Sequence, residues 1–261
     1  MLTKLNNGLK MLDKKILVVF GDSNVWGAEL KDVPEKQQEF KSVVYDPNKI
    51  ENWPYHIRYS FSGVLAQRHN MQILNLAIPG SSNDTIFRRV NKFLQGKYPV
   101  NVNDCFVMVF WTAVERREFY KAKNKMYLNY SPLWGHFMQI PWHKKFHNVY
   151  SKNMFDRNYD IQRTFDYMQS LTGLLKYKNI EFTQGYSIYN KQLCELVLKS
   201  KLPNLISNRI QDSVHTITQE LAGKDAKSPN KYQCNKSHPN ELGHIAIADR
   251  YTELLNERQA L

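Results

Sequence analysis

The chain is poor in cysteine and lacks long apolar runs. Its 261 residues include three cysteines, Cys105, Cys194 and Cys234, which are odd in number and far apart. Such spacing forms neither a disulfide framework nor a zinc-binding pattern, and it favours a reducing compartment. No stretch of eighteen apolar residues is present, so we expect no membrane helix. The polar first fifteen residues also lack the apolar core of a signal peptide, which predicts no export by that route.

Acidic residues are scarce relative to basic ones. The chain has 24 Asp and Glu against 36 Lys and Arg, a net charge of +12. Such a balance suits a nucleic acid, an acidic glycan or a membrane surface as partner. The lysines are dispersed, however, and no RNA-binding signature or zinc finger is found. We therefore interpret the charge as a soluble basic surface and do not expect nucleic acid as the partner.

Apolar runs separated by amphipathic stretches indicate the fold class. Runs that are apolar throughout predict buried strands at 16–20 and 105–111, and two further strands are predicted at 72–78 and 180–186. Apolar stripes of helical period predict helices at about 54–65, 83–94, 161–175, 193–198 and 241–256. Asn83 is expected to cap the second of these helices. The alternation predicts an α/β protein in which one parallel sheet is covered on both faces. Neither a repeat nor a linker divides residues 1–261, so we expect a single domain.

The segment 112–155 departs from this pattern. It is aromatic and basic, has no sustained period, and is too long for a plain connection, which predicts a functional or lid-like insertion. Its histidines, at seven- and four-residue spacings without acidic or cysteine partners, do not make a metal site: His136, His143 and His147. Its aromatic side chains either stack on sugar rings or pack the insertion against the domain: Tyr127, Tyr130, Trp134 and Trp142.

Residues suited to acyl transfer follow the predicted strands. Ser23 lies in the turn after the first strand, Gly80 follows the second, Thr112 follows the third, and His238 precedes the final helix. A nucleophilic serine needs a base within hydrogen-bond reach and donors for the oxyanion that it creates. Because the carboxyl ends of parallel strands meet at one edge, these residues are expected to lie close together. Taken singly, each also fits a structural role in a turn or at a helix entry.

Three motifs together carry a resemblance. The segments G-D-S at 21–23, N-L-A-x-P-G-x-S-N-D at 75–84 and H-P-N-x-x-G-H at 238–244 resemble, in order and context, the SGNH (GDSL-type) hydrolases. The resemblance implies a three-layer α/β/α sandwich, flavodoxin-like, with a five-stranded parallel sheet of order 2-1-3-4-5. It also implies that Ser23 is the nucleophile, that His238 is the base, and that the backbone N–H groups of Ser23 and Gly80 bind the oxyanion. The activity implied is a serine-dependent esterase without a cofactor, whose substrate is a small-molecule or carbohydrate ester.

Two positions depart from the family pattern. The oxyanion Asn of the third block is absent, and the text Trp111-Thr112-Ala113-Val114-Glu115-Arg116 instead resembles SGNH-like proteins of tailed phages. There Thr112 is the candidate for a hydroxyl donor in place of the amide. Asn235 stands where the family keeps the triad Asp, and an amide cannot stabilise an imidazolium with a full charge.

These departures leave several alternatives open. His238 works in a dyad oriented by Asn235 or a backbone carbonyl, another carboxylate substitutes, or the activity is weak or absent. The rival hypothesis is therefore a catalytically silent SGNH-fold binding or structural protein, for example of a phage particle. The expected location is the cytoplasm or a virion. His244, inside the final helix, is interpreted as a packing or capping residue.

Overall fold

A parallel β-sheet forms the centre of the computed structural model, which describes residues 15–28, 30, 43–121, 126–132, 141–207, 212–224, 232–233 and 238–259. Its strands pair in the order β2-β1-β3-β6. Their bounds are Ile16–Phe20 for β1, Gln72–Asn75 for β2, Cys105–Trp111 for β3 and Glu181–Tyr186 for β6. All neighbouring pairs are parallel, which confirms the α/β prediction with a parallel sheet.

The fifth strand of the expected order is reduced to a single bridge in the described residues. Gln184 of β6 pairs in parallel with Leu205, and the Gln184 amide donates to the Asn204 carbonyl at 2.8 Å. Asn204 has a φ of +63°, outside the extended region, and Pro203 has no N–H to donate to a ladder. The backbone at this edge therefore does not continue as a strand, and the five-stranded order stays a prediction.

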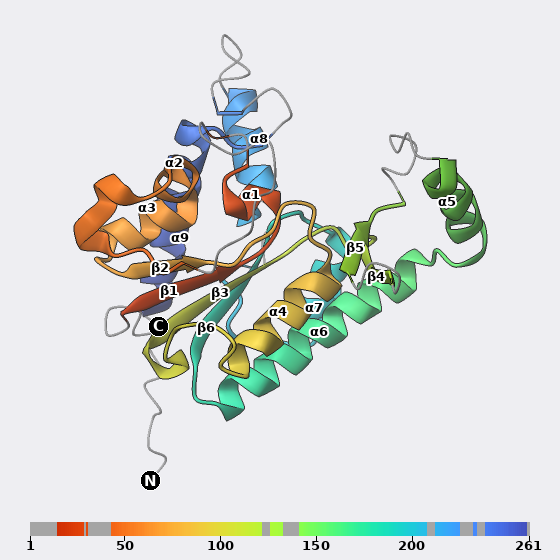
Figure 1. The fold of residues 1–261 in the computed structure, drawn as a ribbon, viewed down its shortest axis with the longest axis horizontal. Helices are drawn as coiled ribbons and strands as arrows, with labels where there is room; N and C mark the ends of the chain where they lie inside the picture. The colour runs from red at the N-terminus through yellow and green to blue at the C-terminus, as the bar shows by residue number, and fades with distance from the viewer. Residues whose placement is uncertain are drawn as a thin grey trace.

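Helices cover both faces of the sheet (Figure 1). One face carries α2 (Tyr55–Tyr59), α3 (Phe61–Arg68), α8 (Val214–Lys224) and α9 (Glu241–Gln259). The other face carries α4 (Asn83–Leu94), α6 (Arg157–Tyr177) and α7 (Lys191–Lys199). Short helical turns complete the described part: α1 (Ser23–Trp26), η2 (Pro47–Asn52) and η3 (Val102–Asp104). None of the helices in the described ranges combines the length and the apolar character that a membrane crossing requires.

Alternate residues of the strands feed two separate cores. Val18 and Phe20 pack with the α4, α6 and α7 side, whereas Leu17 and Val19 pack with the α3 and α9 side. Every residue of β1 and β3 is buried, so neither face of these strands is left for polar side chains. Burying such side chains contributes roughly 1.5–3 kcal/mol each, and the two cores together fix the strand ends that hold the candidate site.

Helix starts differ from the sequence-based expectations at two places. The stretch from Pro54 to Leu65 is not one helix, because Ser60 is extended and its side chain caps α3 by accepting from the Gly63 amide. The cap of α4 is Ser82 rather than Asn83, since the Ser82 hydroxyl accepts from the Thr85 amide at 3.2 Å. The expected cap at Asn83 is therefore wrong.

The insertion is more ordered than its sequence suggests. It contains the antiparallel hairpin of β4 (Arg117–Lys121) and β5 (Met126–Tyr130) and the helix α5 (Pro141–Asn153), at one end of the molecule (Figure 1). Its ring contacts are mostly edge-to-face and join four side chains: Phe119, Tyr130, Phe146 and Tyr150. Tyr130 is buried in this cluster, which agrees with packing rather than sugar stacking at that position. Trp134 and the side chains of Tyr127 and Trp142 lie outside the described residues.

Candidate functional site

Ser23 lies at the carboxyl edge of the sheet, directly beyond β1. The chain turns sharply because Gly21 has no side chain: a Cβ there would lie 2.4 Å from Val25 Cγ2. Asp22 caps α1 by accepting from the Asn24 amide at 3.0 Å. The short helix thereby holds the Ser23 hydroxyl at the edge of the sheet, where open α/β folds bind ligands.

His238 meets Ser23 across 215 residues of sequence. Its Nε2 lies 2.9 Å from Ser23 Oγ, within hydrogen-bond distance. His238 precedes α9, and both side chains are only partly buried, so the pair borders solvent. This geometry is the nucleophile–base arrangement that an activated serine requires.

The backbone N–H groups of Ser23 and Gly80 are the candidate donors to an oxyanion. Ser23 is the first residue of α1, where an N–H has no partner within the helix. Gly80 has a φ of +74°, and a Cβ there would meet no atom within 4 Å, so open space lies in front of this backbone. Within the described part of the chain, neither of these two N–H groups has an acceptor.

Thr112 lies at the same edge, but its hydroxyl is already engaged. Thr112 Oγ1 donates to Asp22 Oδ2 at 2.6 Å, and the residue is 1% exposed. A hydroxyl carries a single hydrogen, so donation to an oxyanion would require this bond to break. The Thr112 amide is also engaged, donating to Asn83 Oδ1 at 2.9 Å. In the described contacts the Thr112 hydroxyl is thus committed to Asp22, and its role as a donor to the oxyanion stays a prediction.

The Asp22 carboxylate joins the ends of three strands. Besides the Asn24 amide and Thr112, it accepts from Ser187 Oγ at 2.6 Å and from Arg116 Nη1 at 3.3 Å. Asp22 is fully buried, and Arg116 is 3% exposed. These contacts tie the residues beyond β1, β3 and β6 to one buried charge.

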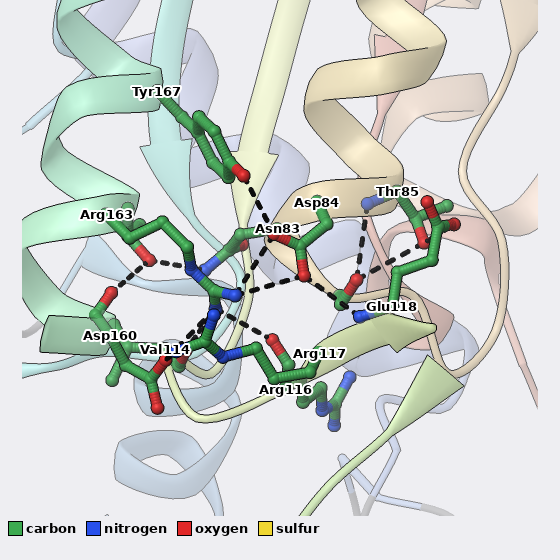
Figure 2. Close-up of polar contacts among 12 residues, drawn as sticks. Asn83, Asp84, Thr85, Val114, Arg116, Arg117, Glu118, Asp160, Arg163 and Tyr167 are labelled. Atoms are coloured by element: carbon green, nitrogen blue, oxygen red, sulfur yellow. Dashed lines mark hydrogen bonds and ion pairs between the residues drawn. The ribbon is translucent and has the colours of Figure 1, made fainter. Parts of the chain in front are cut away.

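A second polar cluster clamps the loop that follows β3 (Figure 2). Arg163 of α6 donates through Nη2 to the carbonyls of Val114 and Arg116, each at 3.1 Å. Its Nη1 donates to Asp84 at 3.2 Å, and Asp84 also accepts from Tyr167 at 2.9 Å. The loop beyond β3 is therefore fixed from the α6 side as well as through Asp22.

Buried charge in this cluster changes proton affinities. Burial raises the pKa of Asp160 to about 6, although the neighbouring Arg117 and Arg163 guanidinium groups act in the opposite direction. Burial and the Asp84 carboxylate likewise raise the pKa of Tyr167 to about 12. Both groups support the wall of the site and do not reach the Ser23 hydroxyl in the described contacts.

His215 is a site neighbour that the sequence did not indicate. Its amide donates to the Ser187 carbonyl at 3.0 Å, and its helix α8 contacts α1. Burial lowers the pKa of His215, the Asp22 carboxylate raises it, and His238 lowers it. Asn83 is another site neighbour, which was expected only as a helix cap, yet its side chain binds both the amide and the carbonyl of Thr112. The sequence around His215 shows no helical period and no motif, so nothing in it marked His215 as a site residue.

The remaining predicted residues are His244, Asn235 and the histidines of the insertion. His244 is fully buried, its Nδ1 accepts from the Phe61 amide at 3.2 Å, and burial lowers its pKa to about 3, so the packing interpretation is confirmed. Asn235 and His136 lie outside the described residues, and the role of Asn235 stays a prediction. No group of His, Cys, Asp and Glu in the described ranges is arranged to hold a metal ion. His147 Nδ1 lies 2.5 Å from the Tyr130 hydroxyl.

Comparison with known proteins finds similar solved structures at low identity. No protein-family model and no curated protein matches the chain. A lipolytic protein of the G-D-S-L family from Veillonella parvula is 11% identical over 92% of this chain and 97% of its own, with a TM-score of 0.49. A psychrotrophic esterase from Pseudoalteromonas sp. is 11% identical over 94% and 98%, with a TM-score of 0.47. An acetylxylan esterase from Geobacillus stearothermophilus is 12% identical over 94% and 96%, with a TM-score of 0.48.

Proposed function

We propose that the chain is a serine-dependent ester hydrolase that removes O-acyl groups from a carbohydrate. The observation that carries the proposal is the 2.9 Å separation of His238 Nε2 and Ser23 Oγ at the carboxyl edge of the parallel sheet. A structural serine in a turn does not need an imidazole nitrogen at its hydroxyl. The motif resemblance in the sequence points to the same two residues.

The reaction follows from the positions of these groups. Ser23 Oγ attacks the acyl carbon while its proton passes to His238 Nε2. The backbone N–H groups of Ser23 and Gly80 bind the oxyanion, which is the interaction that contributes most to such transition states. His238 then returns the proton to the leaving alcohol, and a water activated by the same imidazole releases the acyl group from Ser23.

The group that orients His238 limits the rate in this proposal. Asn235 occupies the position of the family's triad Asp, and an amide oxygen accepts the imidazole N–H without supplying a charge. In a serine protease the equivalent exchange of Asp for Asn lowers turnover about ten-thousand-fold. We therefore propose a dyad of Ser23 and His238 positioned by Asn235.

One observation favours a second candidate function. The Thr112 hydroxyl is committed to Asp22, so the proposed reaction relies on the backbone N–H groups of Ser23 and Gly80 alone for the oxyanion. Losing one such donor costs about 3–4 kcal/mol of transition-state stabilisation. The second candidate is a catalytically silent binding or structural module of the same fold.

Steady-state kinetics with p-nitrophenyl acetate separates the two candidates. The hydrolase proposal predicts measurable turnover by the wild type and loss of at least about 10³-fold in kcat for Ser23→Ala. Ser81→Ala is the matched control, because Ser81 lies next to Gly80 and the proposal gives its hydroxyl no role. Equal turnover by the wild type and Ser23→Ala excludes the hydrolase proposal and leaves the silent module.

A further inference from the structure

A cavity of about 200 Å³ opens beside the candidate site, between the segments that follow β3 and β6. The residues that decide its chemistry are Ala113, Glu115, Phe155, Arg157, Ile188 and Tyr189. Neither the nucleophile nor the base belongs to this cavity, and the proposed reaction does not use its residues. It therefore needs a separate explanation.

The lining of the cavity is connected to Ser23 through residues that bind the Asp22 carboxylate. Ala113 directly follows Thr112, and Ile188 directly follows Ser187. The side chains of Thr112 and Ser187 each donate to the Asp22 carboxylate at 2.6 Å, and Ser23 is the next residue after Asp22. Two lining residues of the cavity are therefore next in sequence to side chains that bind Asp22, the residue before the nucleophile.

The cavity wall is fixed before any ligand arrives. Arg163 holds the carbonyls of Val114 and Arg116 on either side of Glu115, as Figure 2 shows for the loop beyond β3. On the opposite wall, Asn190 caps α7 by accepting from the Leu193 amide at 2.9 Å. A cavity with both walls anchored requires little ordering on binding, which favours affinity.

Size and charge select the class of ligand. About 200 Å³ is below the roughly 300–1,000 Å³ of sites that enclose a drug-sized molecule, so the cavity fits one ring. Glu115 and Arg157 have opposite charges, so an anion that Arg157 attracts is repelled by Glu115. A long acyl chain would have to remove water from both charged groups without replacing their hydrogen bonds.

A neutral sugar ring satisfies all of these features. Its hydroxyls donate to Glu115 and accept from Arg157, and its apolar C–H face packs on the partly buried rings of Phe155 and Tyr189. We infer that this cavity is a subsite for one neutral pyranose ring of the substrate. The inference rests on the proposed function and adds the place at which one sugar ring binds and the residues that contact it.

Glycan binding tests the subsite independently of hydrolysis. Isothermal titration with unsubstituted xylo-, cello-, manno- and chito-oligosaccharides is carried out on Ser23→Ala, and on the same protein with Tyr189→Ala or Arg157→Gln added. At least one glycan is expected to bind, and each added change should weaken its affinity about tenfold. Tyr177→Ala is the matched control, because Tyr177 is 88% exposed at the far end of α6.

Three results overturn the inference. They are the absence of binding by every glycan, equal affinity in Tyr189→Ala and Tyr177→Ala, and a selective loss of p-nitrophenyl octanoate over acetate turnover in Tyr189→Ala with Ser23 intact. The third result would assign the cavity to the acyl chain. Arg157 is exposed, so Arg157→Gln keeps the test decisive if Tyr189→Ala does not fold. Failure of the hydrolase proposal shows instead as absent ester turnover by the wild type, with glycan binding unaffected.

Discussion

Replacing Asp22 by Asn tests whether one buried carboxylate holds the site together. The change keeps the size of the side chain but removes its charge and places an NH₂ group where an oxygen accepts hydrogen bonds. The carboxylate accepts from the Asn24 amide, Ser187 and Thr112 at 3.0, 2.6 and 2.6 Å, and from Arg116 at 3.3 Å. With Asn in place, the Arg116 guanidinium, which is 3% exposed, loses the Asp22 carboxylate as an ion-pair partner.

The expected loss follows from that burial. Removing one partner of a buried ion pair costs about 3–5 kcal/mol, because the remaining charge has left water without compensation. For a domain of this length, 1 kcal/mol corresponds to roughly 2–4 °C in the midpoint of thermal unfolding. Asp22→Asn should therefore lower the free energy of unfolding by about 3–5 kcal/mol and the midpoint by about 6–20 °C.

Urea unfolding followed by circular dichroism measures the change, and an exposed ion pair supplies the control. Asp249 pairs with Arg68 at 2.5 Å, with side chains 57% and 33% exposed, and such pairs contribute about 1 kcal/mol or less. Asp249→Asn removes the same charge from the surface and should change stability by less than that amount. A loss below about 1 kcal/mol for Asp22→Asn, equal to the control, would refute the claim that Asp22 organises the strand ends.

Three further predictions concern single positions. Burial lowers the pKa of His244 to about 3, whereas its unfolded value is about 6.5. Between these values the unfolded state binds more protons, so the free energy of unfolding decreases as the pH is lowered. From pH 8 to pH 5, the free energy of unfolding measured in urea should fall by about 2 kcal/mol more for the wild type than for His244→Asn. An equal fall in both proteins would show that His244 is not buried in its neutral form. Asn235→Asp should raise p-nitrophenyl acetate turnover, at most about thousand-fold, and a fall with the fold intact would contradict the dyad. Gly80→Ala should cost only about 1–2 kcal/mol of stability, since φ is +74° but the space is open. The added methyl group would occupy the space in which the proposal places the acyl group, so kcat should fall at least tenfold, and an unchanged kcat would show that the substrate does not approach this backbone closely.

The central strands were predictable because a strand that is buried on both faces has apolar residues at consecutive positions. Cys105–Trp111 is apolar at every position, and both of its faces are buried in the structure. Helix α8 was not predicted, because Thr218, one of the buried positions described for it, is polar and interrupts the apolar stripe that Val214 and Ile217 begin. The site neighbour His215 lies in this helix and was therefore missed as well.

Side-chain partners at the strand ends could not be predicted from spacing. The strand pattern predicts Thr112 at the carboxyl edge of the sheet, where it lies, but the choice between an oxyanion and Asp22 for its hydroxyl depends on side-chain packing. Asn83 could cap α4 equally well by its residue type, and the three-dimensional position of Thr112 decides that it does not. Local chemistry therefore predicts which residues lie at the edge of the sheet, whereas packing decides which of them remain free.

Covalent labelling by a fluorophosphonate tests the central claim most directly, because it reports an activated serine without knowledge of the substrate. Peptide mapping by mass spectrometry should find the adduct on Ser23 in the wild type, and both Ser23→Ala and His238→Ala should abolish labelling. Ser81→Ala should be labelled at the wild-type rate. Labelling that persists in Ser23→Ala, or a wild type that is not labelled at all, would contradict the account.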